Sequence, residues 1–146
     1  MRKRCKRKVR ALVNPIAYAT EGAAITDGEP LALLRSNERA AIEAVRSGAA
    51  TLADLREIEG MARITRVMAG AGVGPEALVS ALAAEVEVRL MRERLEQGGR
   101  AVATGPGLRA IMDAQEYHDL QRTSISRGEY ERWILKTINL EKAGVL

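Results

Sequence analysis

Seven basic side chains stand among the first ten residues, and no acidic residue separates them. A cluster of this density repels itself, so we expect it to be solvated and mobile until an anion orders it. Nucleic-acid phosphate is the most common partner of such a segment, because each neutralised phosphate releases condensed counterions. The residues that we expect to contact phosphate are Arg2, Lys3, Arg4, Lys6, Arg7, Lys8 and Arg10.

The positive charge is confined to this arm. The chain of 146 residues has a net charge of +4, whereas residues 11–146 carry 16 basic and 19 acidic side chains. Two other interpretations of the arm stay open: a solubilising tail, and a segment that binds an acidic protein or a membrane surface. A secretory signal is disfavoured because Asn14 and Pro15 interrupt the apolar residues that follow the basic run. With uncharged stretches of only about ten residues, against the ~18 that a membrane span needs, we expect a cytoplasmic protein without membrane contact.

The single histidine and single cysteine limit the chemistry of the chain. One cysteine excludes an internal disulfide framework. One cysteine and one histidine together are too few ligands for the usual zinc sites. His118 is the one candidate general base, and the nearest hydroxyls, Thr123, Ser124 and Ser126, lie around the following turn. A lone helical histidine beside acidic residues is more often a hydrogen-bonding residue. We therefore find no catalytic constellation, and we expect no cofactor and no metal.

Two glycine-rich stretches invite comparison with phosphate-binding loops. The residues 70–75 spell GAGVGP and lack both the dinucleotide-binding spacing and the Lys-Ser/Thr pair of a P-loop. The residues 104–107, TGPG, can cap and start a helix, whose free amides would bind an anion weakly. In both stretches, helix punctuation is the interpretation that the sequence favours.

Caps and helix breakers divide the rest of the chain into five predicted helices. The first runs from Pro30 to Gly48, and Thr51 caps the second, which ends at the glycines of residues 70–74. Pro75 opens the third helix, which stops at residues 98–99, and the fourth starts at residues 104–106. The fifth begins with a capping box of Ser126 and Glu129. Residues 101–104 are the one short strand candidate.

These elements predict an all-α fold: a single compact bundle of about five helices over residues 30–146, preceded by a basic arm and an irregular connecting segment over residues 1–29. The alanine-rich start of the third helix permits close approach of a neighbour, and its large apolar residues predict a broad buried face. We also expect Leu120 to point inward. The residues of the broad face are Leu78, Val79, Leu82, Val86 and Leu90. The third helix and the face around Trp133 are candidates for pairing with a second copy.

Three segments resemble small uncharacterised proteins encoded by phages and prophages of proteobacteria. They are RKRCKRKVR with NPIAYA, then AIEAVRSGAATLADLREI, and then TGPGLRAIMDAQEYHDLQRTSISRGEYERWI. The resemblance spans most of the chain and carries over no activity and no functional residue. It implies an accessory or regulatory phage protein in the cytoplasm of a bacterial host.

The sequence leaves three hypotheses of function. The first is a phage or prophage regulatory protein that binds DNA or RNA through its arm, while the bundle supplies dimerisation or partner binding. The second is a helical protein-interaction module that inhibits or recruits a host protein. The third, which the sequence favours least, is a small metal-free enzyme that uses His118.

Overall fold

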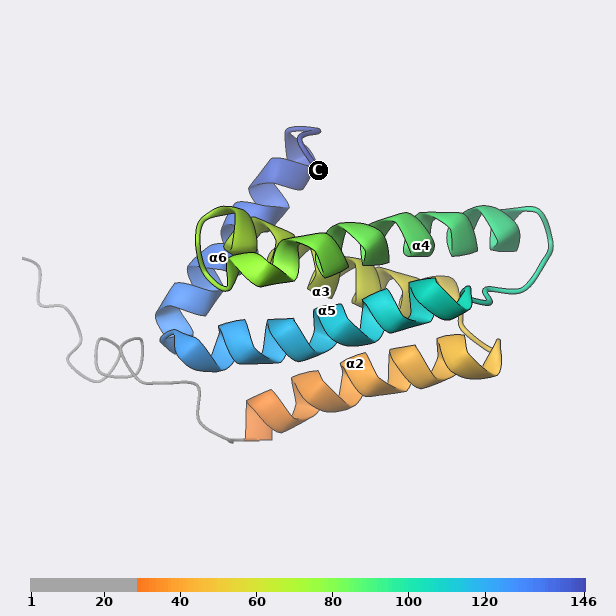
Figure 1. Ribbon diagram of the computed structural model, residues 1–146, viewed down its shortest axis with the longest axis horizontal. Helices are drawn as coiled ribbons and strands as arrows, with labels where there is room; N and C mark the ends of the chain where they lie inside the picture. Colours follow the sequence, from red (N-terminus) through yellow and green to blue (C-terminus); the bar gives the residue numbers. More distant parts are fainter. Residues whose placement is uncertain (1–28) are drawn as a thin grey trace, which may run out of the picture.

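The computed structural model describes residues 29–146, and these residues form an all-α bundle (Figure 1). The predicted fold class of five helices is confirmed for this part of the chain. The basic arm and most of the connecting segment lie outside the described residues. The helices are α2 (Glu29–Ser47), α3 (Leu52–Gly70), α4 (Leu78–Glu96), α5 (Gly105–Ser124) and α6 (Arg127–Lys142), and a 3-10 turn, η1 (Pro75–Ala77), leads into α4.

Side-chain caps start three of the helices, α3, α5 and α6, where the sequence predicts them. Thr51 accepts a hydrogen bond from the Asp54 amide, and the Asp54 carboxylate accepts one from the Thr51 amide at 2.7 Å, so α3 begins with a full capping box. Thr104 accepts from the amide three residues ahead at the start of α5. At Ser126 the structure has the first of the two predicted capping-box bonds, from the Glu129 amide at 3.2 Å.

Glycines in the left-handed region follow the ends of four helices, and the one after α6 is Gly144 at φ +69°. Gly48 has φ +69° after α2, and Gly98 has φ +80° after α4. Gly72 and Gly74, at φ +92° and +60°, turn the chain between α3 and η1. The predicted helix punctuation is confirmed at these positions, where a side chain would be strained. One boundary differs, because Pro75 opens the 3-10 turn and the α-helix begins only at Leu78.

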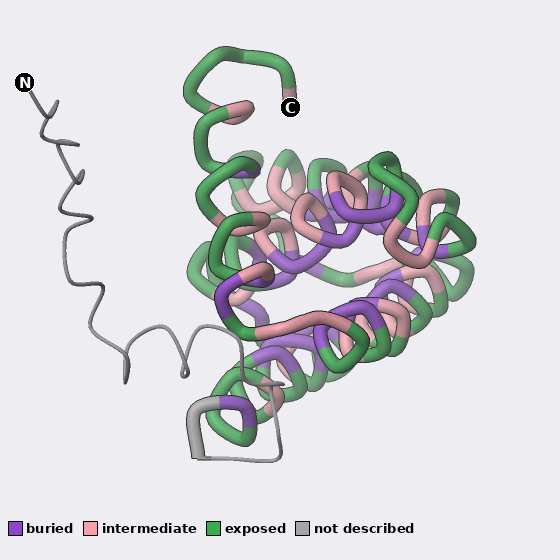
Figure 2. The backbone as a smooth tube through the Cα atoms, turned by 90° about the vertical axis from the view of Figure 1, so that its left-hand side faces the viewer, coloured by how far each residue is buried: buried purple, intermediate pink, exposed green. Residues whose placement is uncertain are grey.

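Helix α3 is the centre of the bundle and packs against α2, α4, α5 and α6. Figure 1 shows α2, α5 and α4 running side by side, with α3 behind them and α6 crossing the end of the bundle. Figure 2 shows that the buried residues gather where the helices face one another, while α6 extends outward to an exposed end. The core therefore forms around α3.

The core consists of aliphatic side chains and many alanines. Large residues such as Leu55, Ile58 and Ile111 are fully buried, and Ala62, Ala84 and Ala114 lie between them. Alanine lets two helix backbones approach closely, which agrees with the expectation for the start of α4. The alanines of α4 that face the bundle are Ala81 and Ala84, and Ala77 of η1 precedes them.

The predicted buried face of the third helix is wrong. Four of its five large residues point to solvent, with exposed fractions of 77% for Val79, 42% for Leu82, 46% for Val86 and 37% for Leu90. The face that packs inward carries Ala81, Ala84, Glu87, Val88 and Met91. Helix α4 has apolar residues on both sides, and the side that packs against α3 and α5 is the one whose N-terminal half has the small residues Ala81 and Ala84.

The orientation predicted for Leu120 on α5 is also wrong, because this side chain is 65% exposed. The inward face of α5 continues from Ile111 and Ala114 to His118, Gln121 and Arg122. The buried face of α5 is therefore apolar in its N-terminal half and polar in its C-terminal half.

An isolated antiparallel bridge joins Ala50, in the turn between α2 and α3, to Ala101, in the turn between α4 and α5. The Arg100 side chain reinforces it by donating to the backbone carbonyls of Gly48 at 3.1 Å and Ser47 at 3.5 Å. The predicted strand candidate at residues 101–104 thus contributes one bridge. We call this junction the Ala50–Ala101 joint.

Candidate functional site

The seven predicted phosphate-binding residues lie outside the described residues. They are Arg2, Lys3, Arg4, Lys6, Arg7, Lys8 and Arg10. The structure therefore describes only the surface of the bundle that follows these residues in the chain.

The bundle balances its own charge. Residues 29–146 contain 16 basic and 17 acidic side chains. Half of these cations form ion pairs within the described residues, several between helices, such as Arg66 with Glu85 at 3.0 Å and Arg92 with Glu59. The cations in ion pairs are Arg35, Arg46, Arg63, Arg66, Arg92, Arg94, Arg122 and Arg127. The excess of positive charge in this protein thus belongs to the arm.

His118 lies at the centre of a buried chain of hydrogen bonds and is only 1% exposed. Its Nδ1 lies 3.0 Å from the Thr65 hydroxyl of α3, and its Nε2 lies 2.9 Å from the Tyr130 hydroxyl of α6. The Thr65 hydroxyl donates its proton to the Met61 carbonyl at 2.8 Å, so it accepts from Nδ1–H. Nε2 of the neutral ring then accepts from Tyr130.

Burial holds this imidazole neutral. The pKa of His118 falls from 6.5 to about 3, mainly because the ring is removed from water. The positive charge of Arg122 contributes to the fall, and the negative charge of Asp119 opposes it in part. Burial also raises the pKa of the Tyr130 hydroxyl. Both rings therefore stay uncharged near neutral pH, and their arrangement joins α3, α5 and α6.

Beside His118, four charged side chains alternate in sign between α2 and α5. Arg122, which is fully buried, donates to both Glu38 carboxylate oxygens at 2.7 and 3.0 Å and to Asp119 at 2.9 Å. Arg35 donates two bonds of 2.8 Å to Asp119. Burial alone would raise the pKa of Asp119, but the bonds from Arg35 and Arg122 lower it. We call Arg35, Glu38, Asp119 and Arg122 the α2–α5 charge cluster.

The hydroxyls considered as nucleophiles in the sequence make their contacts elsewhere. Thr123 donates to the Asp119 and Leu120 carbonyls, and Ser124 donates to the Gln121 carbonyl. Ser126 accepts from the Glu129 amide. The groups that the structure brings to His118 are Thr65 and Tyr130, which the sequence did not single out for this role.

The N-terminus of α5 already holds a carboxylate. Glu87 of α4 accepts from the Thr104 amide at 2.8 Å and from the Thr104 hydroxyl at 3.0 Å. Gly107 packs so closely on this carboxylate that a Cβ atom at residue 107 would lie inside van der Waals contact with it. Thr104 is therefore the helix cap that the sequence favours. Glu87 of the same chain lies where the less favoured alternative, weak binding of an external anion, would place that anion.

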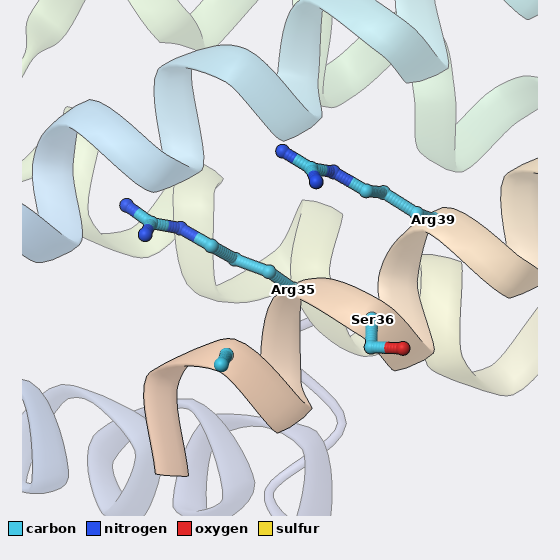
Figure 3. A pocket seen from close by; sticks show the side chains of 4 residues that line it. Arg35, Ser36 and Arg39 are labelled. Atoms are coloured by element: carbon cyan, nitrogen blue, oxygen red, sulfur yellow. The ribbon is translucent and has the colours of Figure 1, made fainter. Parts of the chain in front are cut away.

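Two surface hollows are lined by cationic side chains. The one on α2 has a volume of about 440 Å³ and is lined by Ala32, Arg35, Ser36 and Arg39. Figure 3 shows Arg35 and Arg39 extending side by side toward α5. Arg35 is engaged with Asp119, whereas the Arg39 side chain is exposed.

The second hollow lies on α6 and has a volume of about 270 Å³. Its lining residues are Glu129, Arg132, Trp133 and Lys136, and the Lys136 ammonium lies 4.7 Å from the centroid of the Trp133 ring. A cation above an indole ring is a favourable contact. This hollow thus combines an aromatic face with both signs of charge.

Within residues 29–146, no group of three or more histidine, cysteine or acidic side chains is arranged to hold a metal ion. None of the helices in this part of the chain has the length and apolarity of a membrane span.

Comparison with models of protein families, with curated proteins and with solved structures gave no match to this chain.

Proposed function

We propose that this protein binds nucleic acid through its basic N-terminal arm, as an accessory or regulatory protein of a phage or prophage in the bacterial cytoplasm. The observation that carries the proposal is the separation of charge. Seven cations stand in residues 1–10 without an acidic neighbour, while the bundle has a near-neutral surface with half of its cations paired. Since cations that follow one another in the sequence without acidic residues between them bind phosphate with release of counterions, the arm would supply affinity with little base specificity.

The salt dependence of binding tests this proposal. Fluorescence anisotropy of nuclease-treated protein is measured against duplex DNA, single-stranded DNA and structured RNA over a series of salt concentrations. If all seven side chains contact phosphate, the slope of log K against log salt on duplex DNA approaches about −6. Deletion of residues 1–10 is expected to abolish binding.

A matched pair of triple variants assigns the contacts. Replacing Arg2, Arg4 and Arg7 by Gln is expected to make the slope shallower by about 3. Replacing Arg56, Arg109 and Arg132 by Gln removes the same charge from exposed side chains that have no ion-pair partner among residues 31–146, and should leave the slope close to that of the natural chain. Equal effects of the two variants, or no binding at low salt, would contradict the proposal. The second result would favour a protein partner.

A further inference from the structure

Helix α4 exposes a row of large apolar side chains to the solvent. Its large residues Val79, Leu82, Val86 and Leu90 are exposed, while its buried side carries Ala81, Ala84, Glu87, Val88 and Met91. With Ala83, these residues form one continuous apolar row, which we call the α4 stripe. A helix that is apolar on two sides is typically covered on both.

The bundle covers one side of α4 only. Helices α3 and α5 pack on the side of Ala81, Ala84 and Val88, and ion pairs with α3 fix this orientation through Glu85 and Arg92. The α4 stripe lies away from these contacts and spans about 16 Å along the helix from Val79 to Leu90. A contiguous apolar row of this kind marks an interaction surface.

Charged residues at the ends of the α4 stripe favour a second copy of this chain as its partner. Glu76 and Arg89 are exposed and have no ion-pair partner among the described residues. In an antiparallel pair of two α4 helices with Leu82 opposite Ala83 of the second copy, Val79 lies opposite Val86. The same register brings η1, the 3-10 turn that carries Glu76, to the level of Arg89 of the second copy. Each of these contacts occurs twice, because the surface is its own complement.

The parallel alternative lacks this complementarity. A parallel two-fold pair would bring Arg89 to Arg89 and Glu93 to Glu93, and like charges facing each other are destabilising. The antiparallel register instead joins opposite charges at both ends of an apolar centre. The charge pattern thus favours a second copy in antiparallel orientation over a parallel one.

We propose that the α4 stripe is the interface of a homodimer in which two α4 helices pack antiparallel around a two-fold axis near Leu82 and Ala83. This dimer does not depend on the proposed function of the arm. A single pair of helices buries little surface, so the dimer should form and dissociate with protein concentration.

Sedimentation velocity of the full chain over a concentration series, without nucleic acid, tests the interface. The natural chain is expected to shift from monomer to dimer as its concentration rises. Val86→Glu places a charge in the apolar centre and should weaken the dimer at least about tenfold. Leu120→Glu makes the same kind of change on an exposed residue of α5 and should leave the dimer unchanged. Circular dichroism confirms that both variants fold.

A charge exchange tests the register. Glu76→Arg and Arg89→Glu should each weaken the dimer, because each brings like charges to the same level twice. The double variant should restore it. A natural chain that stays monomeric at every concentration, or a dimer that Val86→Glu does not weaken, would overturn the proposal. Failure of the double variant to restore the dimer would overturn the antiparallel register.

Discussion

The neutral His118 gives the fold a specific dependence on pH. The folded pKa, about 3, lies below the ordinary value of 6.5, so the unfolded chain binds the proton more readily. Stability from this residue is fully present above about pH 6.5 and is lost as the pH falls toward 3. For one proton the slope reaches about 1.4 kcal/mol per pH unit. Urea unfolding at several pH values between 4.5 and 7 is expected to show this loss.

His118→Asn provides the comparison, because an amide can keep a donor and an acceptor in the ring position. This variant should be less stable at pH 7 but should lack the histidine part of the slope. Carboxylates such as Asp119, whose pKa is lowered, contribute equally to both proteins and cancel in the difference. If the two slopes coincide between pH 4.5 and 6.5, then His118 is not held neutral in the folded chain.

Gly107 is required by the carboxylate that it covers. Gly107→Ala would push Glu87 from its bonds with Thr104, so we expect a loss of about 1–3 kcal/mol in the free energy of unfolding. Gly60→Ala is the control, since a Cβ at this position in α3 meets no atom within 4 Å. It should stabilise the protein by about 0.5–1 kcal/mol. Urea unfolding midpoints measure both, and a neutral Gly107→Ala would show that Glu87 moves freely.

At the scale of elements, the α2–α5 charge cluster decides how firmly α2 is held. Arg122→Met leaves Glu38 buried without its cation, whereas Asp119 keeps Arg35. We expect a loss of about 3–5 kcal/mol in the free energy of unfolding. The double variant with Glu38→Met removes both charges and should recover part of that loss. A double variant that is no more stable than Arg122→Met alone would contradict this account, with chemical denaturation as the measurement.

The ends of the helices could be predicted from the sequence, whereas their faces could be predicted only in part. Thr51, Thr104 and Gly48 act through their own backbone or through residues three positions away, so local sequence suffices. The buried face of α4 depends on which neighbour packs against it. Because Val86 and Val88 are equally apolar, periodicity alone cannot choose between their two sides.

The α2–α5 charge cluster shows the same limit at the scale of the whole molecule. Glu38 and Arg122 are 84 positions apart, and only the fold pairs them. A signal did exist: Glu38 interrupts the apolar row of Leu31, Ile42 and Val45 on α2, and a charge at such a position requires a buried partner. The arm is the opposite case, because the sequence of residues 1–10 shows its high charge density without any knowledge of the fold.

The Ala50–Ala101 joint affects which helices unfold together. It ties the turn of the α2–α3 hairpin to the turn of the α4–α5 hairpin at one end of the bundle, where Figure 1 shows both turns side by side. Neither hairpin can swing out without breaking the bridge and the bonds of Arg100. Amide protons of these four helices should therefore exchange with solvent as one cooperative unit, while the outer turns of α6, beyond Thr137, open on their own.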